Sequence, residues 1–578
     1  MLHVDCARVS VSNPFFQCVK LVMNEDDLIG RERTSHEKRR WVRLTRTCNN
    51  NCLFCLDADI RGKKVRGTDE VRKEIEDGIE EGCERLILSG GEPTLHPDYV
   101  DFIALGERLG YGWIQTVTNG RMFAYREFAR RAVAAGLDEA TFSLHGHRPE
   151  LHDELVGVEG AFEQSTRGMQ NLLKQGIVVN VDVVLNALNV PVLDDILQFY
   201  IARGIREFDL LWMVPFGAAW RNRSRLFPDR TDALKSLHQA IGNARRKGVV
   251  IWTNRLPAGL LEGHEYLVQD PHKIHDEVRG RRPEFERFLR TGEVLECFQP
   301  QRCGQCPMQN FCQNLFELVG GLQKGRVPDI AVDLGREPSP GQVELSSRSR
   351  ALRLRTSDMQ RASAFLDRLE PRQRKLVIEL TDSGEPDTRS IEFDASVRPA
   401  RVASASPAVL DRLLAGVGMN VEIMLNRATA AWLGENAAAL AEQRDSTWFV
   451  SLEKFDTLEA LTRTGCDPVE ALGRLEQPAK LGLLDLPPCA LPRAGFRVGE
   501  KWLPIEVLPD GRHPDLTVFT EHFIRNEFNV HSLRCDDCTQ KRTCPGWPLN
   551  LVRSLSFSSL CRPIGADEAS PDFYNPHD

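Results

Sequence analysis

The 578-residue sequence lacks any run of about 18 apolar residues, the shortest stretch that crosses a bilayer as a helix. Its first twenty residues lack the apolar core and the small-residue cleavage site of a secretory signal. Charge of neither sign dominates, because 74 Lys and Arg stand against 82 Asp and Glu. The balance gives no general affinity for polyanions. A hydrophobic share of 42% with 27% charge excludes a largely disordered chain. We therefore expect a globular cytoplasmic protein.

Cysteine, by contrast, is abundant, with 16 residues in the chain. In a reducing cytoplasm thiols stay reduced or bind metal rather than form disulfides. Eleven cysteines fall into three groups: Cys48, Cys52 and Cys55; Cys297, Cys303, Cys306 and Cys312; and Cys535, Cys538, Cys544 and Cys561. Cys6, Cys18, Cys83 and Cys466 stand alone, as small buried hydrophobic residues often do. Cys489 also stands alone, upstream of the third group.

From Trp41 the sequence alternates between strand-like and helix-like segments. In residues 68–81, for example, Val71, Ile75 and Ile79 recur at helical spacing. Further helices are expected at residues 98–109, 124–136, 161–175 and 192–203. Six β-then-α units in succession indicate an α/β fold with a parallel sheet, either open or closed into a partial barrel. In both arrangements chemistry belongs at the carboxyl ends of the strands.

The remainder divides by composition. We expect a preamble at 1–40, the α/β unit at 41–225, a helical and charged region with the second cysteine group at 226–334, a linker at 335–350, a small α+β domain without chemical motif at 351–480, a second cysteine module at 481–562 and a tail at 563–578. Within 351–480, KLVIEL is expected to pair with RSIEFD across a turn. One internal repeat is visible: residues 302–312 match 534–544 in every cysteine and in the leading arginine.

The first cysteine group directly follows the first expected strand, with spacings of four and three residues. Three thiolates on one loop can hold a small metal cluster, and thiolates are the usual ligands of iron–sulfur clusters. A structural zinc site needs a closed set of four ligands. A zinc knot completed by Asp57 or by a distant residue is the alternative.

Several further motifs follow in order along the same unit. Phe54 precedes the third cysteine, Ser89-Gly90-Gly91-Glu92-Pro93 ends the second expected strand, and Thr118-Asn119-Gly120 ends the third. Ser143-Leu144-His145-Gly146, Asn186 and Met213-Val214-Pro215-Phe216-Gly217 end the next three. With the cysteine loop, these motifs resemble the radical S-adenosylmethionine (radical SAM) superfamily across 41–217. The resemblance implies a partial (β/α)6 TIM-type barrel.

The resemblance also implies cofactors and their contacts. Cys48, Cys52 and Cys55 would ligate three irons of a 4Fe–4S cluster, leaving the fourth iron to chelate SAM. Glu92 would accept hydrogen bonds from the SAM ammonium group, Phe54 would contact the adenine, and Ser143 and Asn186 would offer polar contacts. Gly90, Gly91, Pro93, Asn119 and Met213 complete the cofactor-binding set. Reductive cleavage of SAM would give a 5′-deoxyadenosyl radical that takes hydrogen from a substrate.

No catalytic side chain is assigned from the sequence. His145 and His147 flank a glycine, but such residues are more often loop or core histidines than general bases. His96 is expected to pack against or cap the following helix.

The later cysteine groups could close further metal sites. The second group supplies four cysteines, and Cys535, Cys538 and Cys544 need Cys489 or Cys561 as a fourth. They resemble the SPASM or twitch type of auxiliary-cluster extension, which implies one or two auxiliary 4Fe–4S clusters. Neither group has the further cysteine of a full SPASM domain, and Phe316 lies in that region of the first. The CxxC pairs alone are equally compatible with zinc.

These patterns predict a radical SAM enzyme that receives electrons from a flavodoxin or ferredoxin. Relatives with such extensions often modify peptides, so a peptide substrate leads and a small biosynthetic molecule is the alternative. The competing class is a zinc-knuckle protein that binds nucleic acid. Arg534, Lys541, Arg542 and Arg553 agree with it, whereas the net charge of −8 and the strand-end motifs argue against nucleic acid as a partner.

Overall fold

The computed structural model describes residues 25–60, 62, 65–370, 373–382, 399–415, 419–443, 446–475, 481–491, 495–497 and 500–565. Two parallel β-sheets follow one another along this chain, each built from consecutive strands. The strands of the first sheet lie in sequence order: β1 (Arg39–Thr45), β2 (Arg85–Gly90), β3 (Trp113–Thr118), β4 (Glu139–Ser143), β5 (Val178–Leu185), β6 (Glu207–Trp212) and β7 (Val250–Asn254).

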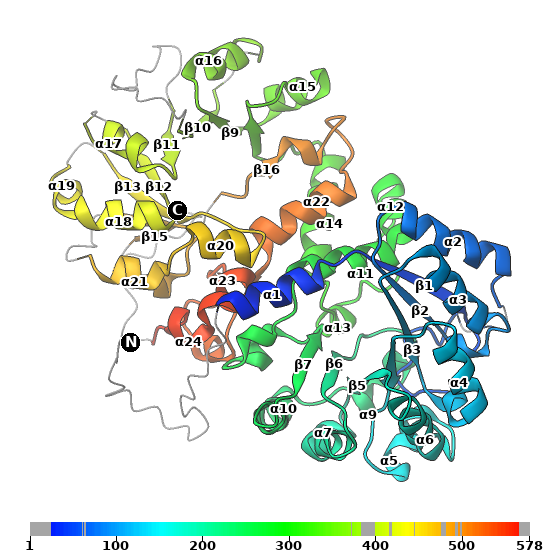
Figure 1. Ribbon diagram of the computed structural model, residues 1–578. Coiled ribbons are helices and arrows are strands. Elements are labelled where there is room, and N and C mark those ends of the chain that lie inside the picture. Colours follow the sequence, from blue (N-terminus) through cyan, green and yellow to red (C-terminus); the bar gives the residue numbers. More distant parts are fainter. Residues whose placement is uncertain are drawn as a thin grey trace.

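Helices connect these strands and cover one face of the sheet (Figure 1). The main ones are α2 (Thr68–Glu80), α3 (Tyr99–Leu109), α4 (Arg126–Ala134), α5 (Pro149–Val156), α6 (Ala161–Leu173), α7 (Leu193–Ile201) and α10 (Arg230–Arg245). Val71 and Ile75 of α2 are fully buried, as the helical spacing predicts. The partial barrel is confirmed, but it has seven strands rather than six. The additional strand, β7, lies in the segment expected to be helical.

Alternate residues of each strand face opposite sides of the barrel wall. On β5, Val181 and Val183 are fully buried in the core beneath the helices. Asp182 and Val184 face the interior of the barrel and keep part of their surface accessible. The interior therefore carries polar side chains, whereas the outer face is apolar.

Residues 351–480 do not form a separate α+β domain. Their strands belong to a second parallel sheet, with the strand order β15-β14-β13-β12-β11-β10-β9-β8-β16. These strands are β8 (Ile330–Asp333), β9 (Ala351–Thr356), β10 (Lys375–Leu380), β11 (Arg401–Ser404), β12 (Val421–Leu425), β13 (Trp448–Leu452), β14 (Leu481–Leu484), β15 (Gly495–Arg497) and β16 (Leu503–Pro504). Strand β10 pairs in parallel with β9 and β11. RSIEFD, the expected partner of β10, lies outside the described residues.

The strands of the second sheet carry a buried network of ion pairs. Its charged residues explain why the sequence did not indicate a parallel sheet here. Arg353 Nε lies 2.8 Å from Glu379 Oε2, and Arg353 Nη1 lies 3.3 Å from Glu422 Oε1. Arg401 Nε lies 2.8 Å from Glu422 Oε2, and its Nη2 lies 2.8 Å from Glu500 Oε2. Strands buried in parallel sheets usually read as continuous apolar runs. Here the charged residues interrupt those runs.

Helices also connect the strands of the second sheet: α15 (Pro340–Arg348), α16 (Met359–Asp367), α17 (Pro407–Ala415), α18 (Arg427–Glu435), α19 (Ala437–Glu442), α20 (Leu458–Thr464) and α21 (Pro468–Gly473). The first of them occupies the segment expected to be a linker. Ser339 and Gln342 form a reciprocal capping box at its start, and Pro340 stands at its first position. The polar, proline-containing composition of 335–350 thus marks a helix start rather than a linker.

The same turn follows the seventh consecutive strand in each half of the chain. Both β7 and β14 are followed by a non-glycine residue with positive φ, Arg255 at 63° and Asp485 at 54°. A Leu-Pro pair and a short 3-10 helix come next, η4 (Ala258–Leu261) in the first half and η8 (Pro488–Ala490) in the second. The repeated cysteine spacing lies farther along in each half. The repeat seen in the sequence therefore extends to the structure that precedes each cysteine module.

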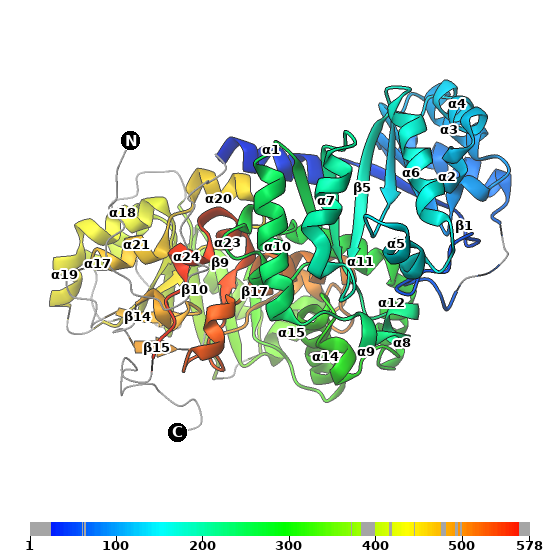
Figure 2. The same ribbon diagram turned by 90° about the horizontal axis from the view of Figure 1, so that it is seen from below.

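The two halves lie at opposite ends of the molecule, and α1 (Glu25–Ser35) bridges them (Figure 2). Glu32 of this helix accepts hydrogen bonds from the backbone N–H groups of Leu458 and Glu459 at the start of α20. Arg553 of α23 (Leu549–Leu555) lies 3.2 Å from Glu32 and 3.3 Å from Asp270. These contacts tie the N-terminal helix to the second half.

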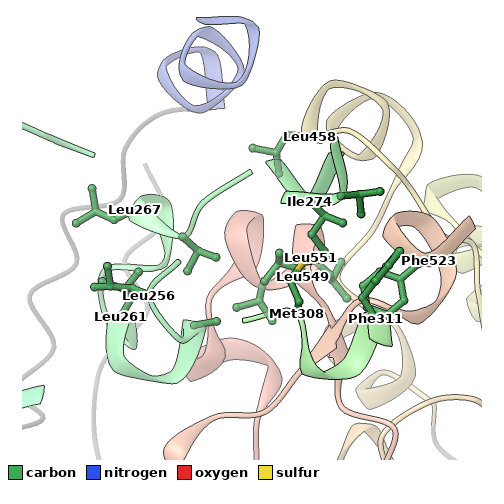
Figure 3. Close-up of a cluster of buried hydrophobic side chains, with 14 of the residues drawn as sticks. Leu256, Leu261, Leu267, Ile274, Met308, Phe311, Leu458, Phe523, Leu549 and Leu551 are labelled. Atoms are coloured by element: carbon green, nitrogen blue, oxygen red, sulfur yellow. The ribbon is translucent and has the colours of Figure 1, made fainter. Parts of the chain in front are cut away.

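An apolar cluster joins the halves near their centre (Figure 3). Phe311 of α14 (Gln309–Gln323) packs edge-on against Phe523, with ring centroids 5.4 Å apart. Leu549 and Leu551 of α23 lie in the same cluster. The remaining helices of this region are α11 (Ile274–Gly280), α12 (Arg282–Thr291), α13 (Pro300–Cys303), α22 (Leu516–His522) and α24 (Phe557–Leu560). None of the helices in the described ranges combines the length and apolar character that a bilayer crossing requires.

Candidate functional site

The three-cysteine loop leaves the carboxyl end of β1 and is held by its backbone. The N–H groups of Asn51 and Leu53 donate to the carbonyls of Val156 and Leu155, at 2.8 and 2.9 Å. The carbonyl of Cys55 accepts from the N–H of Ala218, at the start of α8 (Gly217–Arg221), at 2.9 Å. Elements from both sides of the barrel therefore fix where the three thiols lie.

The glycines after β2 let a second loop press against the first. Gly90 has a φ of 142°, a conformation that other residues rarely adopt. A Cβ atom at Gly90 would lie 2.5 Å from the carbonyl oxygen of Thr45, and one at Gly91 would lie 2.3 Å from that of Thr47. Any larger residue here would push the cysteine loop away from β2.

Glu92 is buried outside the cavity and joins the segments that follow β2 and β3. Its Oε1 accepts from Thr94 N (3.1 Å), Thr94 Oγ1 (2.5 Å) and Thr118 Oγ1 (2.7 Å), and its Oε2 accepts from Asn119 N (2.8 Å). Burial raises the pKa of this carboxyl group, and the hydrogen bonds act against that rise. Glu92 is fully buried and is not among the residues that line the cavity.

Asn119 links Glu92 to the cysteine loop by hydrogen bonds. Its side-chain amide donates to Asn49 Oδ1 at 2.6 Å. Arg121 donates to the carbonyl of Asn49 at 2.5 Å and to Asn50 Oδ1 at 3.0 Å. A chain of hydrogen bonds thus runs from buried Glu92 through the end of β3 to the residues between Cys48 and Cys52.

A cavity of about 260 Å³ opens at the carboxyl ends of the strands. The three cysteines line it together with Phe54 of their own loop and with predicted residues from four further segments: Gly90, Gly91, Asn119, Ser143 and Met213. The structure therefore brings most of the predicted set to one place. Pro93 and Asn186 are buried outside this lining. Asn186 instead holds the turn after β5, because its Oδ1 accepts from Leu188 N and its backbone N–H donates to Asn189.

His145 lines the cavity, whereas its neighbour His147 does not. The ring of His145 packs edge-on against Phe54, with centroids 4.7 Å apart, and its Nδ1 accepts from Val184 N at 3.2 Å. Burial holds the pKa of His145 well below its ordinary value, with a further contribution from His152. His145 is therefore neutral and accepts at Nδ1, as a packed core histidine would. His96 Nδ1 accepts a hydrogen bond from the N–H of Asp98, which directly precedes α3. His96 was expected to pack against or cap this helix.

Several lining residues carry no motif and were missed from the sequence. They are Arg46, Asn50, Leu56, Val117, Val184, Leu211, Trp212 and Arg255. Arg255 follows the unexpected strand β7, and its Nε donates to Glu277 at 2.5 Å. The β-branched run from Val249 to Thr253 was the signal that would have located it.

The second cysteine group forms a small pocket beside the barrel. Cys297, Cys303, Cys306 and Cys312 all line it, with Phe316 and Pro215 among their neighbours. Arg281 Nη2 donates to Cys297 Sγ at 2.8 Å. Burial raises the pKa of Cys306 to about 11 and that of Cys312 to about 12, so a bound cation would be needed to hold them as thiolates.

This pocket adjoins the cavity of the barrel. Pro215 and Phe216 line the cysteine pocket, while Met213 and Val214 line the cavity. Arg302, next to Cys303, donates through Nε to the carbonyl of Pro215 at 2.7 Å. A four-residue segment after β6 therefore separates the two groups of thiols.

The third group gathers five cysteines rather than four. Cys489 and Cys561 both interact electrostatically with Cys535. The thiols of Cys535 and Cys561 share a hydrogen bond, which lowers the pKa of Cys535 and raises that of Cys561. Cys489 also lies close to Cys538 and Cys544. Of the two candidates for the fourth ligand, Cys489 interacts with all three other cysteines, whereas Cys561 interacts with Cys535 and with Cys489.

The third group rests on the first half of the molecule. Ser532 Oγ and Arg534 Nε donate to the carboxylate of Glu262, just after η4, at 2.6 and 2.5 Å. The backbone N–H of Phe557 donates to Glu265 Oε1 at 2.9 Å. Cys489 lies in η8, which follows β14 of the second sheet. The five thiols therefore lie where the halves meet.

The spacing of the sulfur atoms tests which metal these groups fit. Two thiolates on one tetrahedral zinc ion lie about 3.8 Å apart, given Zn–S bonds of about 2.3 Å. In the described part of the chain, only His36, Asp270 and His272 place three ligand atoms within 4.8 Å of one another. No three described cysteines do so. In an iron–sulfur cluster each thiolate binds a different metal atom, so its ligands need not lie this close together.

Comparison with known proteins gives a match for the domain that contains the first of these sites. Residues 42–199 match the model of the Radical SAM superfamily. Over 178 residues the chain is 30% identical to a probable GTP 3′,8-cyclase of Sulfurisphaera tokodaii, covering 30% of this chain and 56% of that protein. Over 179 residues it is 30% identical to an AdoMet-dependent heme synthase of Oleidesulfovibrio alaskensis, covering 30% and 45%. The match spans about half the length of these relatives.

Among solved structures, Streptococcus suis SuiB bound to the precursor peptide SuiA has a TM-score of 0.35 at 14% identity, over 42% of this chain and 55% of that one. The matched residues 42–199 include the whole three-cysteine loop and the ends of β2, β3, β4 and β5 that face it. Radical SAM proteins hold a 4Fe–4S cluster and SAM, and three thiols that line one cavity are a donor set that fits such a cluster. Residues 42–199 therefore form a domain of the radical SAM superfamily.

Proposed function

We propose that the protein is a radical SAM enzyme that binds its cluster and SAM in the cavity at the carboxyl ends of the first sheet. The observation that carries the proposal is the set of three cysteines lining one cavity with the strand-end residues of the family. When bound, the reduced cluster supplies the electron that cleaves SAM to methionine and a 5′-deoxyadenosyl radical. The cytoplasmic location expected from the sequence stays a prediction.

The residues of the chain would bind and orient these groups. Cys48, Cys52 and Cys55 would hold the cluster, and the glycines after β2 allow the backbone to approach SAM closely. Ser143 and Asn119 offer polar atoms to the cavity, whereas Phe54 and Met213 offer apolar surface. Glu92 and Asn186 make their hydrogen bonds within the protein, so we assign them to positioning rather than to contact with SAM.

The second and third cysteine groups would each hold an auxiliary cluster. The support is that four thiols line one pocket and five cysteines gather in the third group. The second group adjoins the cavity through residues 213–216, so it is placed to exchange electrons with a substrate there. The third group lies farther away, at the contact between the halves. A flavodoxin or ferredoxin would supply the reducing electrons.

The substrate we propose is a peptide, because the cysteine groups resemble the SPASM type of extension. A small biosynthetic molecule is the second candidate. It is favoured by the relatives matched over the barrel, which are named as a GTP cyclase and a heme synthase. The zinc-knuckle class is disfavoured by the net charge of −8 and by the strand-end motifs of the first sheet.

Anaerobic reconstitution followed by iron and sulfide counting tests the number of clusters. About four, eight or twelve irons per chain would correspond to one, two or three clusters. Replacing Cys48, Cys52 and Cys55 by Ala should remove four irons and abolish 5′-deoxyadenosine formation under reducing conditions. Cys83, a partly buried cysteine on the rim of the first sheet, provides the control as Cys83→Ala. Unchanged 5′-deoxyadenosine formation in the triple variant would overturn the proposal.

A further inference from the structure

Two aspartates lie side by side in the interior of the first barrel. Asp182 of β5 and Asp209 of β6 are register partners on neighbouring parallel strands. Both face the interior, because they alternate with fully buried apolar residues on the same strands. Both residues lie deep within the protein, but each keeps a small solvent-accessible surface.

The aspartates lie directly beneath the cavity. Ser143, the register partner of Asp182 on β4, lines the cavity. Val184 and Leu211, two residues further along β5 and β6 on the same face, line it as well. The aspartate pair is not itself part of the lining and lies one layer below it, under Val184 and Leu211.

Neither carboxylate has the partners that buried charges usually require. Asp209 Oδ1 is shielded from bulk water and has no hydrogen-bond partner within the described residues. Burial raises the pKa of Asp182 above its ordinary value, and the negative charges of Asp209 and Glu139 add to the rise. Burial also raises the pKa of Asp209, and Arg255 and Lys273 counteract this from a greater distance.

Several other interior carboxylates within the described residues accept hydrogen bonds or form ion pairs, unlike this aspartate pair. Glu139 accepts from Arg85 at 2.8 Å, from Trp113 at 2.7 Å and from Asn180 at 2.8 Å. Glu207 accepts from Trp252 Nε1 at 2.7 Å. The interior of the second sheet pairs every described carboxylate of its network with an arginine or lysine. These carboxylates therefore have hydrogen-bond or ion-pair partners, whereas the two aspartates below the cavity do not have the same support.

The geometry points to a substrate-anchoring site: we propose that Asp182 and Asp209 together receive a cationic nitrogen group of the substrate, such as the ammonium of a lysine side chain. The methylene groups of such a side chain would run upward along Val184 and Leu211 towards Met213, all of which line the cavity. The cation would compensate the two neighbouring charges and donate hydrogen bonds to Asp209 Oδ1. This inference rests on the proposed function and names the chemical class of its substrate.

Calorimetric titration of the reconstituted full-length protein with SAM, but without reductant, tests the site. The probes are N-acetyl-lysine methylamide and its uncharged counterpart N-acetyl-norleucine methylamide. We expect the lysine probe to bind at least tenfold more tightly than the norleucine probe. The double variant Asp182→Asn, Asp209→Asn should lose this preference, whereas the exposed control Asp195→Asn should keep it.

Equal binding of the two probes, binding of neither, or a preserved preference in the double variant would overturn the inference. The thermal midpoint of the double variant separates binding from folding. It should equal or exceed that of the native protein, because two adjacent buried charges have been removed. A lowered midpoint would show that the pair holds the fold together instead. Since no reductant is present, probe binding is independent of SAM cleavage, so either proposal can fail alone.

Discussion

Replacing Glu92 by Gln separates two roles that the residue could have. The amide keeps the shape of the side chain but offers one acceptor oxygen instead of two. In one orientation its NH2 group faces the N–H of Asn119, and in the other it faces the N–H of Thr94. In each orientation the amide NH2 group and the backbone N–H face one another, so neither of these two buried donors has an acceptor. Each unsatisfied donor costs about 1–3 kcal/mol. Loss of a buried negative charge offsets part of this, so we expect a net destabilisation of about 1–4 kcal/mol.

Hydrogen exchange read by mass spectrometry measures this effect where it arises. The amides of residues 92–95 and 118–120 should exchange about 5- to 800-fold faster in the variant, given about 1.4 kcal/mol for each factor of ten. The exposed substitution Glu107→Gln should leave these amides unchanged. If Glu92→Gln weakens SAM binding while exchange stays as in the native protein, Glu92 contacts SAM directly and the positioning role is refuted.

Three further predictions concern the rest of the molecule. Arg353→Met should lower the free energy of unfolding by about 3–5 kcal/mol in denaturant titrations, because it leaves two buried glutamates without this partner; a loss below about 1 kcal/mol would contradict the ionic network. The hydrogen bond to Asp270 raises the pKa of His36, so the stability that His36→Gln removes should be fully present below the ordinary pKa of about 6.5 and vanish as pH rises through the raised pKa. A difference between native and variant protein that grows from pH 6 to pH 9 would contradict this. Gly217→Ala, which places a Cβ 2.5 Å from the carbonyl of Cys55, should lower the iron bound after reconstitution, and undiminished iron would show that the loop can shift.

The sequence predicts the first barrel well because its signals are local. Strands and helices alternate with clear periodicity, and the motif residues end their strands. Since parallel strands bring their carboxyl ends to one edge, Cys48, Gly91, Asn119 and Ser143 had to lie close together. Strand β7 was missed because it sits within a highly charged segment whose helices dominate the pattern.

The second sheet was not predictable by the same signals. Its strands are short, and interior residues such as Arg353 and Glu422 break the apolar runs that mark parallel strands. Their pairing depends on contacts between residues far apart in the chain. The aspartate pair was invisible for a similar reason, because Asp182 and Asp209 meet only through the register of β5 and β6.

The central claim is that three thiols leave one metal atom of a cluster open for SAM. Low-temperature electron paramagnetic resonance tests it most directly, on a reduced variant in which Cys303, Cys306, Cys535 and Cys538 are replaced by Ala. We predict an iron–sulfur signal that changes shape when SAM is added, because SAM then binds an atom without a protein ligand. A signal that SAM leaves unaltered, or the absence of any iron–sulfur signal, would contradict the account.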